Sequence, residues 1–234
     1  KKKMNWPYFS KEEIKKVSQV IKSGKVNYWT GEECKKFEKE FSKYMGLNYC
    51  ISVANASLGL EAALLSLNLK KNDEVITTPR SYNSSATSIL RAGGKVIFAD
   101  INKETQNIDP ISIKNKISKN TKAILCVHLG GMPCDMSSIK KITKKYNLKL
   151  IEDCSQAHGA KYFDKYVGSF GDISVWSFCN DKIISTLGEG GMVSIKDKKT
   201  YKKIWSIKEI GKDYNLANKP EKPTFKWLHD DLGT

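Results

Sequence analysis

One lysine stands between a predicted buried strand and a glycine-rich turn in the stretch SFCNDKIISTLGEGG, residues 177–191. The apolar run 173–178 predicts the strand, and the glycines within 188–191 predict the turn. Lys182 has mostly apolar and small neighbours, whereas most other lysines lie on charged helical faces. Such surroundings remove water from an amine and favour its neutral, nucleophilic form. Lys182 is therefore a candidate to form a Schiff base with a carbonyl cofactor, pyridoxal 5′-phosphate above all; the alternative is a surface lysine in a loop.

A carboxylate follows a second predicted strand. The apolar run 148–151 predicts the strand, and Asp153 and Gln156 stand just beyond it. In open α/β sheets, ligands bind beyond the carboxyl ends of the strands. Asp153 there could pair with the pyridine nitrogen of the cofactor and keep it protonated, while Gln156 could donate to the phenolic oxygen. The alternative role of Asp153 is to cap the turn that follows.

Small residues link a third predicted strand, 49–53, to a predicted helix over 58–67. A strand, a small-residue turn and a helix N-terminus make an anion site, because free backbone N–H groups and the helix dipole both favour negative charge. We therefore expect the turn that contains Ala56 and Ser57 to hold the cofactor's phosphate. The alternative is an ordinary serine N-cap on a core helix.

An aromatic residue follows the predicted strand 74–77. Tyr82 lies at the same expected edge of the sheet, where its ring could stack on a flat cofactor. Its alternative role is that of a core aromatic at the start of a helix.

Strands and helices alternate along the chain, which predicts a three-layer αβα fold with a mostly parallel central sheet. Predicted helices cover 11–23, 32–44, 58–67, 83–92, 110–117, 136–146 and 199–209. Predicted strands cover 49–53, 74–77, 95–99, 123–127, 148–151, 173–178 and 191–195, with a small hairpin over 161–168. We expect an N-terminal helix and arm over 1–30, a large cofactor-binding domain over 31–210, and a loop over 211–234.

Composition excludes several classes of protein. The 234 residues contain no apolar run long enough for a membrane span. The six cysteines form no CxxC pair or His/Cys cluster, so we expect no metal site and reduced thiols in a cytoplasmic protein. The net charge of +15 could indicate nucleic-acid binding, but Arg80 and Arg91 are the only arginines among 40 basic residues. Because arginine dominates base and phosphate recognition, we expect no nucleic-acid partner.

Six segments in order resemble the sugar aminotransferases of the DegT/DnrJ/EryC1/StrS family. They are TG…FE within 28–38, ANASL over 54–58, TTPRSY over 77–82, VHLGGMPCDM over 127–136, EDCSQAHG over 152–159, and SF…K…GEGG over 177–191. One such match is weak, whereas six in order over nearly the whole chain are specific. The resemblance implies a pyridoxal phosphate enzyme of fold type I, similar to the large domain of aspartate aminotransferase.

The resemblance also implies a role for each site residue. Lys182 would carry the Schiff base and move the proton during transamination. Asp153 would pair with the pyridine nitrogen, Gln156 would contact the phenolic oxygen, and Tyr82 would stack on the ring. The phosphate contacts implied are the backbone N–H groups of Ala56 and Ser57 and the hydroxyl of Ser177.

The chain departs from the family pattern in three ways. Ala56 replaces a glycine, which would be strained if the position needs a positive φ. Ser155 replaces a small apolar residue, a mild change. The family continues into a smaller C-terminal domain where this sequence ends, so we expect a fragment or a truncated enzyme. His158 occupies a family position, and we interpret it as a packed, hydrogen-bonded structural histidine.

The implied function is transamination of a nucleotide-linked keto-sugar, commonly a 4-keto-6-deoxy sugar, by a cytoplasmic homodimer. Glutamate would be the amino donor, and the product would serve surface polysaccharides such as lipopolysaccharide. One alternative is a sugar dehydratase on the same fold, but those relatives replace the Schiff-base lysine with histidine, so Lys182 argues against it. Another is a non-catalytic or regulatory protein. The sequence does not specify the sugar, the ring carbon or the nucleotide.

Overall fold

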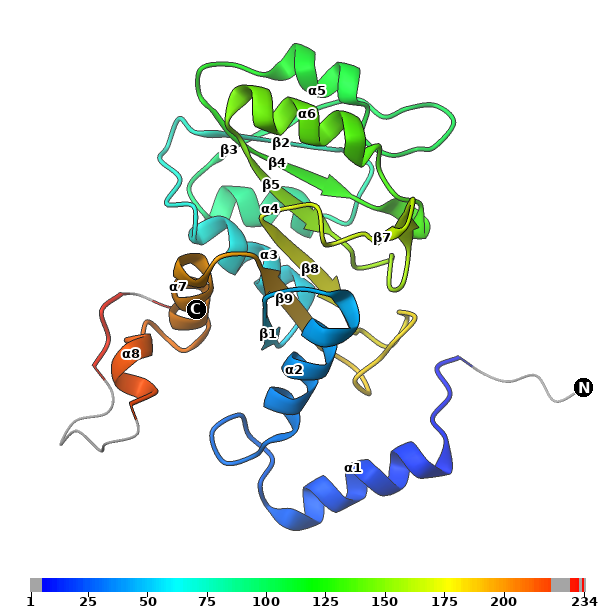
Figure 1. Cartoon of the computed structure of the whole chain (residues 1–234), viewed down its shortest axis with the longest axis vertical. Coiled ribbons are helices and arrows are strands. Elements are labelled where there is room, and N and C mark those ends of the chain that lie inside the picture. The colour runs from blue at the N-terminus through cyan, green and yellow to red at the C-terminus, as the bar shows by residue number, and fades with distance from the viewer. Residues whose placement is uncertain (1–5, 220–227, 232, 234) are drawn as a thin grey trace, which may run out of the picture.

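Seven strands form one central sheet in the order β1-β9-β8-β5-β4-β2-β3 (Figure 1). The computed structural model describes residues 6–219, 228–231 and 233. Neighbouring strands run parallel except β9, which is antiparallel to both β1 and β8. The strands are β1 (Tyr49–Val53), β2 (Glu74–Thr77), β3 (Lys95–Phe98), β4 (Thr121–Val127), β5 (Lys149–Asp153), β8 (Ile173–Ser177) and β9 (Gly191–Ile195). The predicted mostly parallel sheet is confirmed.

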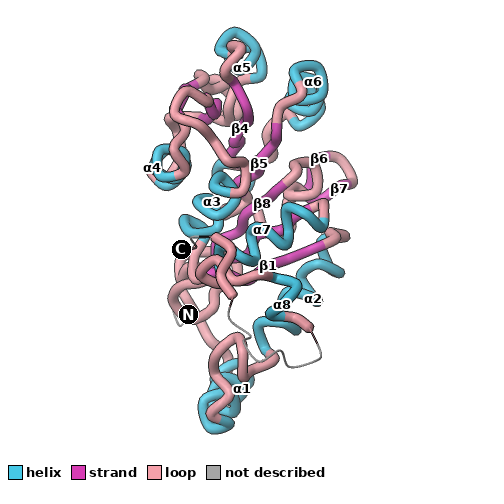
Figure 2. The backbone as a smooth tube through the Cα atoms, turned by 90° about the vertical axis from the view of Figure 1, so that its left-hand side faces the viewer, coloured by secondary structure: helices cyan, strands magenta, loops and turns pink. Residues whose placement is uncertain are grey.

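Helices cover both faces of this sheet. They are α1 (Lys11–Ser23), α2 (Glu33–Met45), α3 (Ala56–Leu65), α4 (Ser84–Arg91), α5 (Pro110–Lys116), α6 (Met136–Tyr146), α7 (Lys198–Lys208) and α8 (Tyr214–Ala217). One buried apolar cluster joins the sheet to α3, α4 and α7, and two others join its opposite face to α5, α6 and α2. In Figure 2, α4 and α6 lie on opposite sides of β4 and β5. The three-layer αβα architecture is therefore confirmed.

Helix α3 approaches the sheet closely because it carries a glycine on its buried face. A Cβ atom on Gly59 would lie 2.9 Å from Cγ1 of Val175 and 3.1 Å from Cγ2 of Val193. Val175 belongs to β8 and Val193 to the neighbouring strand β9. The missing side chain lets the N-terminus of α3 sit against the ends of these strands, where the predicted site lies.

The N-terminal part of the chain is joined to α7. Asn27 Oδ1 accepts hydrogen bonds from the N–H groups of Trp29 and Thr30, which forms a tight turn. The Trp29 indole then donates to Glu209, just after α7, at 2.9 Å. By contrast, α1 buries none of its side chains and extends away from the sheet in Figure 1. None of the helices in the described ranges is long and apolar enough to cross a membrane.

Most predicted boundaries agree with the structure to within two residues, and the differences are informative. β5 continues to Asp153, beyond the predicted end at residue 151, because it pairs there with both β4 and β8. The predicted hairpin is confirmed as β6 (Lys161–Tyr162) and β7 (Lys165–Tyr166). The predicted loop over 211–234 is wrong in part, because it contains α8; residues 220–227 of it lie outside the described residues. The division into three regions stays a prediction.

Candidate functional site

A pocket of about 520 Å³ opens where several strands end. Its walls come from the segments that follow β1, β2, β4, β5 and β8. All seven predicted site residues line it: Ala56, Ser57, Tyr82, Asp153, Gln156, Ser177 and Lys182. The structure therefore brings together residues that are far apart in the sequence. Their individual roles toward a cofactor stay predictions.

Lys182 lies in polar surroundings, so the predicted apolar environment is wrong. Its Nζ is 3.0 Å from Oδ2 of Asp181, and 20% of its side chain is exposed. The neighbouring Ile183 and Ile184 are 59% and 45% exposed and line a different pocket. Adjacent residues in this loop thus face different pockets. The amine and the carboxylate of Asp153 line the same one.

Asp153 is the last residue of β5 and is only 5% exposed. Burial raises the pKa of its carboxyl, and a hydrogen bond from Ser155 and the charge of Lys182 oppose that rise. The Ser155 N–H donates to Oδ1 at 3.0 Å, so the carboxylate also caps the turn after β5. A buried carboxylate of this kind is stabilised by a cationic partner.

Gln156 is oriented by a segment that the sequence did not predict. A short 3-10 turn, η1 (Leu129–Gly131), follows β4, and the Gly130 N–H donates to Oε1 of Gln156 at 2.6 Å. This hydrogen bond fixes the direction of the amide oxygen, so the NH₂ group of Gln156 is the end that can donate to a ligand. The VHLGG segment, 127–131, was a possible signal, since its glycines permit the positive φ found at Gly130.

The phosphate turn is an open helix N-terminus. α3 begins at Ala56, and the N-cap is Asn55, whose side chain accepts from the Leu58 N–H at 3.0 Å. The expected alternative of a Ser57 cap is therefore wrong. No α-helical partner exists for the N–H groups of Ala56 and Ser57, because they are in the first turn. Ala56 has helical backbone angles, so replacing the family glycine causes no strain.

The first residue of strand β9 lies directly against this turn. A Cβ atom on Gly191, the first residue of β9, would lie 2.9 Å from the backbone nitrogen of Ala56 and 2.7 Å from the carbonyl carbon of Asn55. Glycine is therefore required for the close approach of β9 to the turn. This contact gives a physical reason for the last glycine of the GEGG segment.

Tyr82 and Ser177 complete the pocket. The Tyr82 side chain is 76% exposed, which excludes the alternative of a core aromatic. Ser177 is the last residue of β8 and is 6% exposed. Its Oγ accepts a hydrogen bond from the Cys179 N–H at 3.3 Å, which leaves its O–H as a donor.

His158 differs from the predicted structural histidine. The ring packs against Phe178, with 5.6 Å between centroids, so the predicted packing is present. The predicted hydrogen bonds are wrong: neither buried ring nitrogen makes one of normal geometry with the described residues, although the backbone of Ser177 lies near. Burial lowers the pKa of His158.

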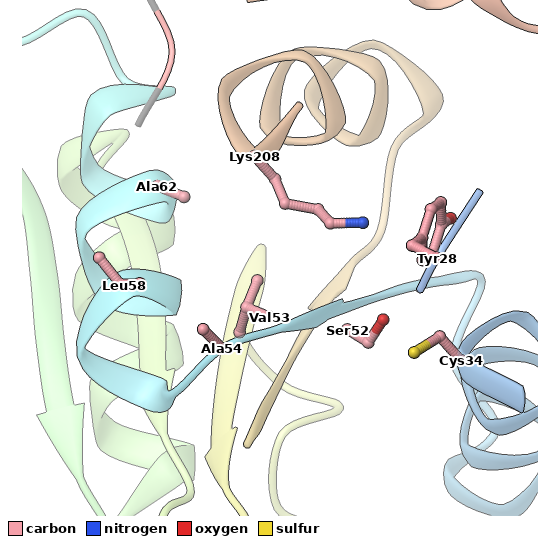
Figure 3. A pocket seen from close by; sticks show the side chains of 8 residues that line it. All are labelled: Tyr28, Cys34, Ser52, Val53, Ala54, Leu58, Ala62 and Lys208. Atoms are coloured by element: carbon pink, nitrogen blue, oxygen red, sulfur yellow. The ribbon is translucent and has the colours of Figure 1, made fainter. Parts of the chain in front are cut away.

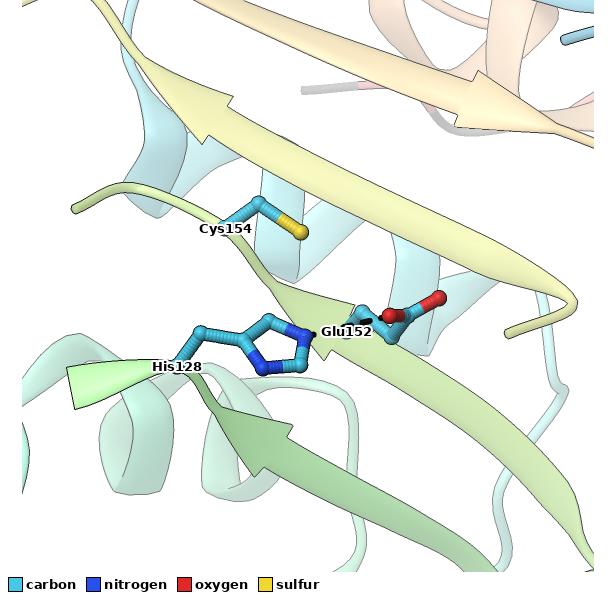
Figure 4. A group of neighbouring side chains, drawn as sticks. All are labelled: His128, Glu152 and Cys154. Atoms are coloured by element: carbon cyan, nitrogen blue, oxygen red, sulfur yellow. Dashed lines mark hydrogen bonds and ion pairs between the residues drawn. The ribbon is translucent and has the colours of Figure 1, made fainter. Parts of the chain in front are cut away.

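One buried group resembles a metal site in composition. Figure 4 shows His128, Glu152 and Cys154, whose possible ligand atoms all lie within 4.8 Å of one another. Nδ1 of His128 already accepts the Cys134 N–H at 3.0 Å, and Nε2 lies 3.1 Å from Glu152 Oε2. Glu152 also accepts three backbone N–H groups from residues 168–171. The group therefore works as a hydrogen-bonded anchor between β4, β5 and that turn.

A second pocket, of about 400 Å³, lies on the other side of the phosphate turn (Figure 3). Lys208 extends into it from α7, and its Nζ lies 3.3 Å from the centroid of the Tyr28 ring. The same Nζ is 2.7 Å from Glu209 Oε1. None of the predicted site residues lines this pocket. Its lining comes instead from the N-terminal segment, β1 and the turn after it, and helices α2, α3 and α7.

The sequence pattern of the DegT/DnrJ/EryC1/StrS aminotransferase family matches residues 7–225, nearly the whole chain. The chain belongs to this family. A family member, the GDP-perosamine synthase of Escherichia coli O157:H7, is 44% identical over 181 residues, which are 77% of this chain and 50% of that protein. This chain spans about half the length of the curated relatives it matches.

Solved structures that are similar to this chain have the same fold. The aminotransferase from Psychrobacter cryohalolentis superposes with a TM-score of 0.95 at 45% identity, covering 99% of this chain and 59% of that one. The Escherichia coli GDP-4-keto-6-deoxy-D-mannose-3-dehydratase with bound hydrated PLP gives a TM-score of 0.84 at 30% identity, covering 91% and 57%. The predicted fold-type-I large domain is confirmed.

Proposed function

We propose that this chain is the cofactor-binding part of a pyridoxal phosphate-dependent aminotransferase that acts on a nucleotide-linked keto-sugar. One observation carries the proposal. The amine of Lys182 and the buried carboxylate of Asp153 line the same pocket as an open helix N-terminus. An amine, a buried anion and a phosphate site are the three groups that pyridoxal phosphate requires.

The pocket residues fit this cofactor. The phosphate would bind the N–H groups of Ala56 and Ser57 and the hydroxyl of Ser177. Asp153 would pair with the ring nitrogen, which relieves the cost of burying its negative charge. Two further contacts complete the set: the NH₂ group of Gln156 to the phenolic oxygen, and the exposed ring of Tyr82 to the face of the cofactor.

Lys182 would supply the amine that reacts with the cofactor's aldehyde and later moves a proton on the substrate carbon that carries nitrogen. Its ammonium must first leave Asp181, at 3.0 Å, and lose a proton. When bound, the cofactor acts as an electron sink that makes this proton mobile. The protein's part is to hold the amine, the carboxylate and the phosphate turn in one arrangement.

The proposed acceptor is a 4-keto-6-deoxy sugar linked to a nucleotide, with glutamate as donor and a product used in surface polysaccharides. A relative at 44% identity bears the name GDP-perosamine synthase, which supports a nucleotide-sugar substrate. We also propose that the working form is a homodimer, as the resemblance implies. These finer assignments concern a whole enzyme, because the relatives are about twice as long as the part that this chain matches.

A dehydratase on the same fold is the second candidate, because a similar solved structure is a sugar dehydratase. Lys182 favours the aminotransferase, since an amine is what exchanges with an amino donor through the cofactor. A regulatory protein remains a third alternative, because one relative at 37% identity is named a pleiotropic regulatory protein.

Incubation with pyridoxal phosphate, glutamate and a panel of nucleotide-linked keto-sugars tests the proposal, with products identified by mass spectrometry. We expect an amino-sugar from at least one substrate, and none from Lys182→Ala. Loss of a hydroxyl group as water, without net amino transfer, would favour the dehydratase. Failure of the whole panel, with cofactor bound, would favour the regulatory alternative.

A further inference from the structure

Buried polar atoms without partners gather around the loop that carries Lys182. Five buried side-chain polar atoms in the described part of the chain make neither a hydrogen bond nor an ion pair. Four of them are Nδ1 and Nε2 of His158, Nε1 of Trp176 and Oγ of Ser185. Buried polar groups in folded proteins are nearly always paired, so this concentration requires an explanation. It indicates that the loop takes another arrangement in the working enzyme.

The unpaired groups share one location. His158 and Trp176 line a pocket of about 380 Å³ between α2 and the loop, and so do Ile183 and Ile184. These two isoleucines directly follow Lys182 and directly precede Ser185. The imidazole also packs on Phe178, the first residue after β8 and the start of the loop. His158 therefore contacts the base of the loop and lines the same pocket as the two isoleucines after Lys182.

The lowered pKa of His158 favours its neutral form, which can accept a hydrogen bond. Burial lowers the pKa of the imidazole; the Ser177 backbone opposes this in part, and the positive charge of Lys182 adds a smaller lowering. The neutral ring has one nitrogen that accepts a hydrogen bond and one that donates. A hydroxyl such as that of Ser185 can donate to the first of these.

Lys182 is now paired with Asp181 inside its own loop. Its amine must leave that carboxylate and turn into the pocket to react with a cofactor. We propose that His158 is a positioning residue, whose neutral imidazole accepts a hydrogen bond from the Ser185 hydroxyl in the cofactor-bound chain and so holds Lys182 turned into the pocket. This inference rests on the proposed function, because it requires pyridoxal phosphate to bind.

A double-mutant cycle tests this inference. His158→Phe keeps a ring but removes both nitrogens, Ser185→Ala removes the donor, and His158→Gln keeps a polar acceptor as the matched control. The dissociation constant for pyridoxal phosphate is measured by visible absorbance on the full 234-residue chain. We expect each single change to weaken binding about tenfold, the double variant to be no weaker than the singles, and His158→Gln to stay within about threefold of wild type.

Hydrogen–deuterium exchange of residues 179–190 gives a second readout that does not depend on activity. Cofactor should protect this loop in wild type and protect it less in His158→Phe and Ser185→Ala. Additive effects in the cycle, or wild-type binding and protection in both single variants, would overturn the inference alone. A wild-type chain that binds no pyridoxal phosphate would overturn the proposed function together with it. If His158→Phe fails to fold, as judged by circular dichroism, Ser185→Ala decides by the same two readouts.

Discussion

Two adjacent carboxylates at the end of β5 have opposite electrostatic roles. Burial tends to raise the pKa of Glu152, but hydrogen bonds from His128 and from backbone N–H groups at Gly168 and Gly171 hold it below the usual value. Asp153 has fewer donors, so its pKa is raised by burial. Alternation along a strand sends the two side chains to opposite faces. Glu152 therefore anchors the structure, whereas Asp153 keeps a buried charge available for a ligand.

At the residue scale, this contrast predicts that Asp153→Asn stabilises the cofactor-free chain. Asp153 in the folded state binds its proton more tightly than in the unfolded state, so the free energy of unfolding falls as pH rises from the unfolded pKa of about 3.9 through the raised folded pKa. Asparagine does not ionise, so the variant avoids this loss of stability, and its side-chain oxygen can still accept a hydrogen bond from the Ser155 N–H. We expect a gain of about 0.5–2 kcal/mol at neutral pH, measured by urea unfolding, and much weaker cofactor binding.

The control for this prediction is pH itself. Near pH 3, where the aspartate is neutral in both states, the stabilities of Asp153→Asn and wild type should converge. A variant that is less stable than wild type at neutral pH, or a stability difference that persists unchanged at about pH 3, would contradict the electrostatic explanation.

At the element scale, the site depends on how closely α3 and β9 approach each other. Gly59 lets α3 lie on β8 and β9, and Gly191 lets β9 reach the backbone of the phosphate turn. These close approaches position the N–H groups of Ala56 and Ser57. The phosphate site is thus a consequence of two small residues in two different elements.

Gly59→Ala should therefore destabilise the fold. Its new methyl group would contact Val175 and Val193 at 2.9 and 3.1 Å, which are too short for relaxed packing. We expect a loss of about 1–3 kcal/mol in urea unfolding, together with weaker cofactor binding as α3 shifts. Gly188→Ala is the matched control for stability, because a Cβ atom there meets nothing within 4 Å and the residue has no positive φ. Equal losses in the two variants would show that close packing of α3 is not the cause.

Local sequence predicted many elements well, because their signals are local. The predicted helix 11–23 agrees with α1, whose start is held by a capping box of Ser10 and Glu13 with both hydrogen bonds present. The apolar run of β1 and its small-residue turn predicted the first wall of the pocket. All seven site residues were predicted to lie together, and they line one pocket.

Other features depend on contacts between distant segments and could not be predicted. β5 extends through the polar pair Glu152 and Asp153 because its neighbours Val127 and Val175 supply strand partners. The polar surroundings of Lys182 arise because Ile183 and Ile184 turn to another pocket. Side-chain direction within an irregular loop has no periodic signal in the sequence.

At the scale of the whole molecule, the N-terminal segment and α7 are held together across the sheet edge. Trp29 packs edge-on against Trp205 and donates to Glu209, which also pairs with Lys208. Glu209 is only 7% exposed, so these partners replace the water that its carboxylate would otherwise bind. The junction lies next to the pocket that Tyr28 and Lys208 line.

Trp29→Phe is expected to weaken this junction. The change keeps an aromatic ring against Trp205 but removes the indole N–H that Glu209 accepts at 2.9 Å. We expect the free energy of unfolding to fall by about 1–3 kcal/mol, since a buried charged acceptor loses a donor. Trp6→Phe is the matched control, because Trp6 is 63% exposed. If both variants unfold at the same urea concentration as wild type, the junction contributes little to stability.

The central claim is that Lys182 is the amine that bonds covalently to pyridoxal phosphate. The most direct measurement is the visible absorbance spectrum of the 234-residue chain on titration with pyridoxal phosphate, compared with Lys182→Ala and with Lys196→Ala, which removes a lysine outside the pocket. We predict a protein-bound band in wild type and Lys196→Ala that decreases when glutamate is added, and no such band in Lys182→Ala. The same band in Lys182→Ala, or no band in wild type, would contradict the claim.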